Sequence, residues 1–534
     1  MDKLHSNSLS AQKKDTLKLT GVMSFSVIIG KIFSIPTAIV TAKFLGPSLL
    51  GVLAIINLIT QYAGYTHLGL LQSLSREVPI AYGKGDKEEA RLITDTVYTG
   101  VFVASAFGVL ALWILFISGI TFKGTLNTKI LTLMSLIMIG HRINSFLRTY
   151  VKAEGKFMII GKLDLILKFS SFIAIPAIIL FKLDGALFVM LLSEIVSVGY
   201  YLIRLKKPIF HFYINIKKSL SLLRTGFMIF INGISEGIFW SIDLMILAVM
   251  RTTREVGLYS IGLAVMGIVE QFSRAINMSV YRKIMIESGK FGTASKKHFR
   301  KYTEGLFVIY LMFNSIILGL GILIYMLAIR IILTRYIESL PVMMILMFGN
   351  IVYTSRIFPS IYLNITNQLE KRLLIITIGL GINILLDYLF IINGYGIIGV
   401  AFACSFSFLW ISIMIIILSF KQIYGDIKHA LYFLIKICLI STILTGIIIA
   451  FHNLYALNYI YLVSLYSKLL WGTADLIVKA LLFSIVCVGI YFFFFKEYQL
   501  NKELKPIISY VLYSFTNRLK IGKKTVYEGN SELE

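Results

Sequence analysis

The sequence predicts an all-helical (all-α) protein that crosses a membrane many times. Of its 534 residues, 57% are hydrophobic and only 15% are charged, whereas an ordinary soluble domain is roughly half apolar and a quarter charged. The mean hydropathy is +0.82, and apolar segments follow one another along almost the whole chain. Because a lipid-exposed open sheet cannot satisfy its backbone hydrogen bonds, these segments are expected to be helices. Little sequence then remains for a folded domain outside the membrane.

Fourteen apolar segments are predicted to be transmembrane helices, each of which needs about 20 residues to cross the bilayer. They cover residues 20–42, 48–72, 93–118, 128–149, 163–181, 184–203, 225–250, 256–278, 303–332, 340–364, 372–393, 396–420, 431–451 and 471–495. The hydrophilic start of the chain has no early small-residue cleavage site, which predicts an uncleaved tail rather than a signal peptide.

The formal net charge of +25 is spread unevenly over the connections between these segments. In a soluble protein such an excess indicates nucleic-acid binding, but Lys and Arg also gather in the cytoplasmic loops of membrane proteins. Here the basic residues concentrate in alternate connections, most densely in 204–224, 282–301 and 496–534. We therefore predict a protein of the cell (cytoplasmic) membrane with both termini cytoplasmic and no nucleic-acid partner.

A weak internal repeat divides the chain. A shift of 206 residues places Gly51 on Gly257, Arg76 on Arg282, Gly83 on Gly289 and Lys84 on Lys290. Six spans would then repeat in the same orientation, a layout typical of transporters whose site lies between the two halves near the midplane. The predicted organisation is a cytoplasmic tail (1–19), an N-lobe of six helices (20–203), a basic linker (204–224), a C-lobe of six helices (225–420), two further helices (421–495) and a basic cytoplasmic tail (496–534).

Short glycine- and proline-containing stretches in the connections carry a family resemblance. They are residues 44–51 (FLGPSLLG), 75–79 (SREVP), 83–86 (GKGD) and 394–401 (GYGIIGVA). Together with the fourteen spans, they resemble the oligosaccharide (polysaccharide) flippases of the multidrug/oligosaccharidyl-lipid/polysaccharide exporter (MOP) superfamily, over essentially the whole chain. The resemblance implies a V-shaped cavity between two lobes and alternating access. The implied cargo is an undecaprenyl-diphosphate-linked oligosaccharide, or a relative of it, which is turned to the outer leaflet for cell-surface polysaccharide biosynthesis.

Polar residues inside the spans are the candidates for substrate binding, because an ionisable group at bilayer depth is costly. Cations form charge-assisted hydrogen bonds with a diphosphate, and amides can contact sugar hydroxyls. Arg148 shares a helix face with His141 and Ser145. The predicted cavity residues are Lys31, Arg274, Arg148, Asn232, Asn57 and Gln61. The same side chains could instead join helices or snorkel to the interface.

Three carboxylates inside the spans are candidates for ion coupling. Glu236 and Asp243 lie on one stripe of the segment 225–250, and Asp387 follows Asn383 by one helical turn. A buried carboxylate can bind a proton or Na⁺, either of which removes the cost of its charge. The predicted partners are therefore the lipid-linked glycan, membrane lipid and a coupling H⁺ or Na⁺, with polysaccharide polymerase or assembly proteins as further partners.

No motif predicts catalysis, a cofactor or a metal site. All three cysteines lie in apolar stretches, where neither a disulfide framework nor a zinc site is expected. Residues 233–237 match the nucleophile-elbow pattern and residues 394–399 match the dinucleotide fingerprint, but neither follows a strand as those motifs require. The chain is therefore predicted not to be an enzyme, and no ATPase motif supplies energy for transport.

Alternative functions stay open at this stage. A flippase for lipid II, another peptidoglycan precursor or a sporulation-type precursor would share the fold and the lipid carrier. A cation-coupled multidrug exporter of the same superfamily usually has twelve spans, so the two additional spans and Lys31 argue against it. A membrane polymerase or ligase typically carries a long outer loop with clustered Arg and His, which the connection 452–470 does not provide.

Overall fold

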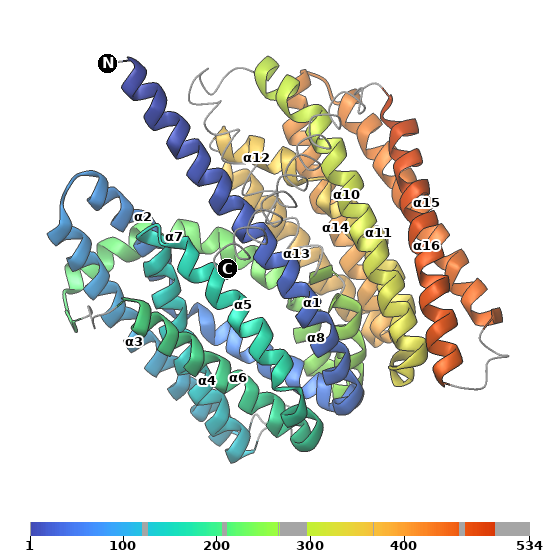
Figure 1. The fold of residues 1–534 in the computed structure, drawn as a ribbon, viewed down its shortest axis with the longest axis horizontal. Coiled ribbons are helices and arrows are strands. Elements are labelled where there is room, and N and C mark those ends of the chain that lie inside the picture. Colours follow the sequence, from blue (N-terminus) through green and yellow to red (C-terminus); the bar gives the residue numbers. More distant parts are fainter. Residues whose placement is uncertain are drawn as a thin grey trace, which may run out of the picture. The chain divides into compact units, whose positions relative to one another are not determined.

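The computed structural model describes residues 2–119, 127–205, 211–264, 266–267, 296–366, 368–458 and 465–496. These ranges contain helices and no β-strand (Figure 1). Within them, ten helices are long and apolar enough to cross a membrane, or eleven if the bent helix α7 is one span. The prediction of an all-helical, multi-pass membrane protein is confirmed, while the count of fourteen spans stays a prediction.

The described helices group into two compact units. Unit 1 comprises residues 1–267, 325–346 and 369–407, and unit 2 comprises residues 268–324, 347–368 and 408–534. In chain order the elements are α1 (Asp2–Ala63), η1 (Gly64–His67), α2 (Leu70–Gly83), α3 (Lys87–Ile117), α4 (Thr128–Ala153), α5 (Phe157–Ile173), α6 (Ile175–Leu205), α7 (Ile216–Phe239), α8 (Ile242–Met250), α10 (Lys296–Ile331), η2 (Thr334–Ser339), α11 (Leu340–Thr354), α12 (Ile357–Ile365), α13 (Leu369–Ile392), α14 (Gly396–Tyr424), α15 (Lys428–Asn458) and α16 (Leu465–Phe494).

Short polar side chains begin several of these helices. Asp86, Asn127 and Asn215 cap α3, α4 and α7, and each accepts a hydrogen bond at 2.8–2.9 Å from the backbone N–H three residues later. An N-cap of this kind satisfies a donor that the helix itself cannot pair, and it contributes about 1 kcal/mol. The capping residue therefore specifies where each of these helices begins, and it lies in a polar connection.

Four predicted spans are not continuous helices. The segment 163–181 is divided between α5 and α6 at Ala174. The segment 48–72 is interrupted after α1 by η1 and by two left-handed residues, Leu68 (φ 46°) and Gly69 (φ 104°). The segment 225–250 is divided between α7 and α8, and the segment 340–364 between α11 and α12. These breaks were not predicted, because the segments on both sides of each break are apolar and hydropathy does not detect a change in backbone direction.

Unit 1 is built around the helices that later form the candidate site. In this unit α1 packs on α5 and α6, α4 packs on α3 and α6, and α13 packs on α7 and α8. One core cluster joins Leu74, Val97, Phe146 and Tyr201, all of which are buried. Large apolar side chains such as Ile117 on α3 point outward instead, as expected for a surface that faces lipid.

Unit 2 uses polar side chains to join its helices. Ser315 of α10 hydrogen-bonds to Tyr491 of α16 at 2.9 Å. Ser441 of α15 donates to the carbonyl oxygen of Phe348 at 2.8 Å. Hydroxyl groups commonly connect helices in this way where lipid removes the hydrophobic driving force between them.

Two glycines from distant parts of the chain meet at a close helix crossing in unit 1. A Cβ atom built on Gly51 of α1 would lie 1.7 Å from the carbonyl oxygen of Thr253, and one on Gly257 would lie 1.9 Å from that of Pro47. Only glycine allows the two backbones to approach so closely. The contact is reciprocal under the 206-residue shift, which relates Pro47 to Thr253 and Gly51 to Gly257.

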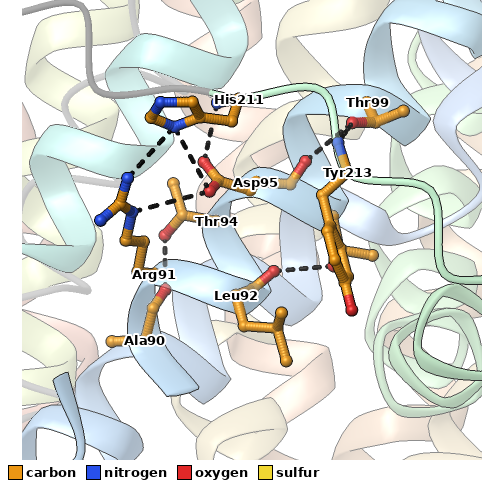
Figure 2. Close-up of polar contacts among 9 residues, drawn as sticks. Ala90, Arg91, Leu92, Thr94, Asp95, Thr99, His211 and Tyr213 are labelled. Atoms are coloured by element: carbon orange, nitrogen blue, oxygen red, sulfur yellow. Dashed lines mark hydrogen bonds and ion pairs between the residues drawn. The ribbon is translucent and has the colours of Figure 1, made fainter. Parts of the chain in front are cut away.

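The connection that leads into α7 is tied to α3 in unit 1 (Figure 2). The backbone N–H of His211 donates to Asp95 Oδ1 at 3.0 Å, and that of Tyr213 donates to Thr99 Oγ1 at 2.8 Å. Arg91 Nε lies 3.9 Å from Asp95 Oδ2. Asp95 is only 7% exposed. The connection is therefore attached to α3 through a buried carboxylate.

Alanine at Gly51 or Gly257 should destabilise the protein, because each new Cβ meets a backbone carbonyl that cannot move aside. Overpacking of this kind costs typically about 1–3 kcal/mol, so the thermal unfolding midpoint in detergent should fall. The double variant should cost less than the sum of the two, because both substitutions separate the same crossing. Gly199→Ala in α6 is the matched control, since nothing lies within 4 Å of its added Cβ. Equal midpoints for Gly51→Ala and Gly199→Ala would contradict the close crossing.

Asp95→Ala should loosen the connection into α7. The substitution removes the carboxylate that accepts from the His211 N–H, and a hydrogen bond to a charged group contributes about 1.5–3 kcal/mol. Hydrogen exchange of residues 211–215 should become faster, as measured by mass spectrometry. Glu88→Ala, an exposed change in the first turn of α3, serves as control. Unchanged exchange in Asp95→Ala would show that this carboxylate does not hold the connection.

Candidate functional site

A cavity of about 640 Å³ lies among the helices of unit 1. Its walls come from α1, η1, α2, α4, α6 and α7, and this volume is within the range of small-molecule sites. Its polar lining includes Asn57, Gln61, His67, Arg142 and Glu194. A chamber with this many polar groups within an apolar helix bundle is suited to bind a polar ligand.

Two of the predicted substrate-binding residues line this cavity. Asn57 and Gln61 lie one turn apart on α1, and both contribute to the wall. Gln61 Nε2 donates to the Tyr65 hydroxyl at 3.2 Å. The ring of Phe230 on α7 lies 6.2 Å from that of Tyr65 and 5.3 Å from that of His67. Amides beside aromatic faces can contact both the hydroxyls and the apolar faces of a sugar.

The carboxylate on the cavity wall is already engaged. Glu194 of α6 interacts with His141 Nδ1 at 3.1 Å and accepts a hydrogen bond from Asn144 Nδ2 at 2.9 Å. Both partners lie on α4, so the bonds join α4 to α6 across one side of the cavity. Both carboxylate oxygens of Glu194 therefore have hydrogen-bonding partners within the wall.

Arg142 of α4 brings a positive charge to the same cavity. Its side chain is 5% exposed, and Nη2 has no hydrogen-bond acceptor in the described part of the chain. A Cβ atom built on Gly64 would lie 2.8 Å from Nη2, so this glycine leaves the space that the guanidinium fills. The cavity thus contains a buried cation whose hydrogen-bonding capacity exceeds what the described wall provides.

His67 in η1 adds a second donor to the cavity wall. Its Nδ1 accepts a hydrogen bond from the backbone N–H of Gly69 at 3.1 Å. This bond assigns the hydrogen of the neutral imidazole to Nε2. The short turn that interrupts the predicted span 48–72 therefore also orients a cavity residue.

A second polar cluster in unit 1 joins α8 and α13. Asp243 lies in the first turn of α8 and is 2% exposed. It accepts hydrogen bonds from Tyr259 Oη and from Asn383 Nδ2, both at 2.5 Å. The carboxyl group of Asp387, one turn after Asn383 on α13, lies beside that of Asp243. The structure thus brings together two predicted ion-coupling residues that are 144 positions apart in the sequence.

This cluster has more acceptors than donors. Asn383 and Asp387 are both fully buried, and within the described ranges neither oxygen of Asp387 nor Oδ1 of Asn383 has a hydrogen-bond donor. Two buried carboxylates side by side repel one another, and unpaired buried acceptors are costly. A cation among these oxygens, or a proton on one carboxyl group, would remove both costs. The residues present therefore fit a small cation.

The other predicted site residues have different surroundings. Arg148 forms a two-bond ion pair with Asp164 of α5, at 2.8 and 2.9 Å, and does not line the cavity. Glu236 of α7 pairs with Arg372 of α13. Asn232 is half-buried on α7, next to Gly233 of the cavity wall.

Two predicted cavity residues cannot be placed at the site. Lys31 belongs to α1, but its side chain lies outside the described part of the structure. Arg274 lies wholly outside the described residues. Their roles in substrate binding stay predictions.

Sequence reasoning missed Arg142, although it is an arginine inside the predicted span 128–149. The polar face inferred for that span joined His141, Ser145 and Arg148, and Arg142 points about 100° away from His141 on a helix. Its neighbours in the cavity come from other helices, so a search along a single helix could not group them. The sequence did contain one indication of a functional role, namely that Arg142 is a charged residue within a predicted transmembrane span.

Comparisons with known proteins identify the family. The model of the polysaccharide biosynthesis protein family matches residues 16–285. No curated protein matches the sequence.

Several solved structures share the fold at low sequence identity. The lipid II flippase MurJ in an inward closed conformation has a TM-score of 0.64 and 16% identity, covering 89% of this chain and 99% of that chain. An inward-facing multidrug resistance MATE family transporter of the MOP superfamily has a TM-score of 0.59 and 13% identity, covering 77% and 99%. A point mutant of the Vibrio cholerae MATE transporter VcmN has a TM-score of 0.52 and 16% identity, covering 79% and 99%.

The matched structures are those of a lipid II flippase and of MATE transporters. The family model covers just over half of the 534 residues, and the fold agrees with it. The chain therefore belongs to the polysaccharide biosynthesis protein family, and it shares its fold with the lipid II flippase MurJ and with MATE transporters.

Proposed function

We propose that the protein is a flippase for a lipid-linked oligosaccharide of the undecaprenyl-diphosphate type. It moves this lipid from the cytoplasmic to the outer leaflet by alternating access, with both termini in the cytoplasm, and supplies cell-surface polysaccharide synthesis. The observation that carries the proposal is the polar cavity of unit 1, where amides and aromatic rings lie beside a buried guanidinium. A glycan joined to a diphosphate needs this combination, because its sugars and its anionic group require different partners.

The charge balance of the cavity distinguishes this proposal from a cationic-drug exporter. A site for cationic drugs needs a carboxylate available to the ligand, whereas Glu194 is occupied by His141 and Asn144. The charge that lacks an ion-pair partner in the described wall is positive, on Arg142. The cavity therefore favours an anionic cargo.

The cluster of Asp243, Asn383 and Asp387 is the proposed coupling site. Its buried oxygens suit Na⁺ or H⁺, and it lies at the break between α7 and α8. Discontinuous helices form coupling-ion sites in many secondary transporters. Cation binding would bring α8 and α13 together, and α7 connects α8 to the cavity wall.

A lipid II or sporulation-type precursor flippase is the second candidate, favoured by the fold shared with MurJ over 89% of this chain. The two candidates carry the same polyprenyl diphosphate and differ in the glycan. Polymerase and assembly proteins would receive the product of a surface-polysaccharide flippase, whereas cell-wall synthases would receive lipid II.

Loss of the protein should strand the lipid-linked intermediate on the cytoplasmic side of the membrane. In a deletion strain, a membrane-impermeant sugar-oxidising or lectin probe should label the intermediate in inverted vesicles and not in intact spheroplasts. Complementation with the wild-type gene is the control. Accumulation of a surface-polysaccharide repeat unit supports the proposal, and accumulation of lipid II supports the second candidate. Unchanged distribution of both lipids would contradict a flippase role.

Asp387→Asn should uncouple transport from the ion gradient, because it removes one charge of the proposed cation site while keeping the shape of the side chain. In proteoliposomes, gradient-driven flipping of the lipid-linked substrate should fall about 10-fold or more, the loss expected when a single ion-pairing group worth about 1.4 kcal/mol is removed. Raising Na⁺ or lowering pH should increase the thermal midpoint of wild-type protein and not that of the variant, because a ligand stabilises only the state that binds it.

Asp184→Asn is the matched control, because Asp184 is a half-exposed carboxylate that pairs with Lys129 outside the cluster. The variant should keep both the gradient dependence and the cation response. If Asp387→Asn retained them as well, the coupling site would lie elsewhere.

A further inference from the structure

The start of helix α7 and the connection before it expose apolar side chains in a basic part of the sequence. The first turns of the helix, Ile216–Phe227, are inclined by 53° to the remainder of it. Five large apolar side chains in this region have exposed fractions between 43% and 81%: Phe212, Ile214, Ile216, Leu220 and Phe227. A group of exposed apolar side chains rimmed by polar residues typically marks a contact with another protein or with a membrane.

The exposed side of these turns is divided lengthwise into two edges. Ile216, Leu220 and Phe227 fall within about 40° of one another around the helix and form an apolar edge. Lys217 and Arg224, which are both exposed, fall within about 20° of one another on the adjoining side and form a basic edge. An apolar strip beside a basic strip is typical of a helix that lies in the membrane interface.

The opposite side of the same turns is attached to the protein. Leu222 and Gly226 are buried, and a Cβ atom built on Gly226 would lie 2.1 Å from the carbonyl oxygen of Gly69. Lys218 pairs with Glu89 of α3. The described residues of unit 1 therefore hold this segment from one side and leave both edges uncovered.

The order of the residues differs from that at the start of an ordinary transmembrane helix. There the polar residues normally come first, and the basic side chains extend back toward the head groups. Here Phe212, Ile214 and Ile216 precede Lys217 in the chain. Exposed apolar side chains therefore flank the basic ones on both sides in the sequence, as in a segment that lies along a membrane surface.

We infer that residues 212–227 form a docking surface for the anionic lipid head groups of the adjacent leaflet. The apolar edge enters the boundary between acyl chains and head groups, while Lys217 and Arg224 reach lipid phosphates. Charge complementarity selects this occupant, because an anionic leaflet favours a basic segment by about fivefold for each Lys or Arg near its surface. That this leaflet is the cytoplasmic one rests on the topology of the proposed function. Anionic lipid would thereby fix the start of α7, the helix that continues into the cavity wall.

Photo-crosslinking to lipid tests this surface. p-Benzoylphenylalanine replaces Leu220 in the full-length protein, in nanodiscs of phosphatidylcholine with a minor fraction of phosphatidylglycerol. Mass spectrometry of the adducts should give a phosphatidylglycerol-to-phosphatidylcholine ratio at least about threefold above the bulk ratio. The same amino acid at Ile117, an exposed apolar position at the far end of α3, should give the bulk ratio. Equal ratios at the two positions would overturn the inference, and so would the absence of lipid adducts at Leu220, the result expected if another protein covers this surface.

Removing the basic edge separates charge from apolar contact. Lys217→Gln combined with Arg224→Gln should return the adduct ratio at Leu220 to the bulk value, while the total lipid adduct stays because the apolar edge is intact. Lys217→Arg combined with Arg224→Lys keeps both charges and should keep the enrichment. Lys152→Gln combined with Lys162→Gln is the matched control, because it removes two exposed cations near the connection between α4 and α5. Equal loss of enrichment in this control would assign the effect to the overall basic surface and overturn the docking surface.

Salt and transport measurements complete the test. About 1 M NaCl shortens the Debye length to about 3 Å, so it should lower the phosphatidylglycerol enrichment without lowering the total lipid adduct. Enrichment that is insensitive to salt would contradict an electrostatic contact. A bulk adduct ratio at Leu220 in a protein that flips the glycan lipid normally would overturn this inference and leave the proposed function intact. Enrichment in a wild-type protein that flips no lipid would have the reverse meaning.

Discussion

The cost of burying charge away from water governs the polar architecture of this protein. Within the described helices, charged side chains are compensated by partners from neighbouring segments: Asp95 by the connection at His211, Arg148 by Asp164, and Glu236 by Arg372. Such pairs neutralise charge and also join helices that lipid would not otherwise hold together. Two places in unit 1 where polar groups lack partners among the described residues, Arg142 and the cluster of Asn383 and Asp387, lie against interruptions of predicted spans.

The two incompletely compensated places have opposite character. The cavity around Arg142 has an excess of donor capacity, and the cluster of Asn383 and Asp387 has an excess of acceptors. The first would suit an anion and the second a cation, as the proposed coupled transport of an anionic lipid would require. Helix α7 connects the two places. It supplies Phe230 to the cavity, and only two residues separate its end from the start of α8, which carries Asp243. A shift of α8 against α13 would act on the cavity through this helix.

The sequence alone was sufficient for the helical class and for part of the site. Asn57 and Gln61 do line one cavity, and Asp243 and Asp387 do lie together, because polar groups in apolar helices must face protein rather than lipid. The breaks at Gly64–Gly69 and at Trp240–Ser241 could not be read from hydropathy, since both flanks are apolar. Arg142 was missed because its partners come from η1, α1 and α6 rather than from its own helix.

An arginine that has no ion-pair partner among the described residues is consistent with the proposed flippase, which must release its cargo. A carboxylate partner such as Asp164 would stabilise the empty cavity, but it would then compete with every arriving phosphate. Without that partner, the empty state is less favourable and binding of the anion recovers the difference, so ligand affinity is gained without adding contacts. In the proposed flippase, the unfavourable burial of the Arg142 charge in the empty cavity would therefore contribute to the selection of an anion.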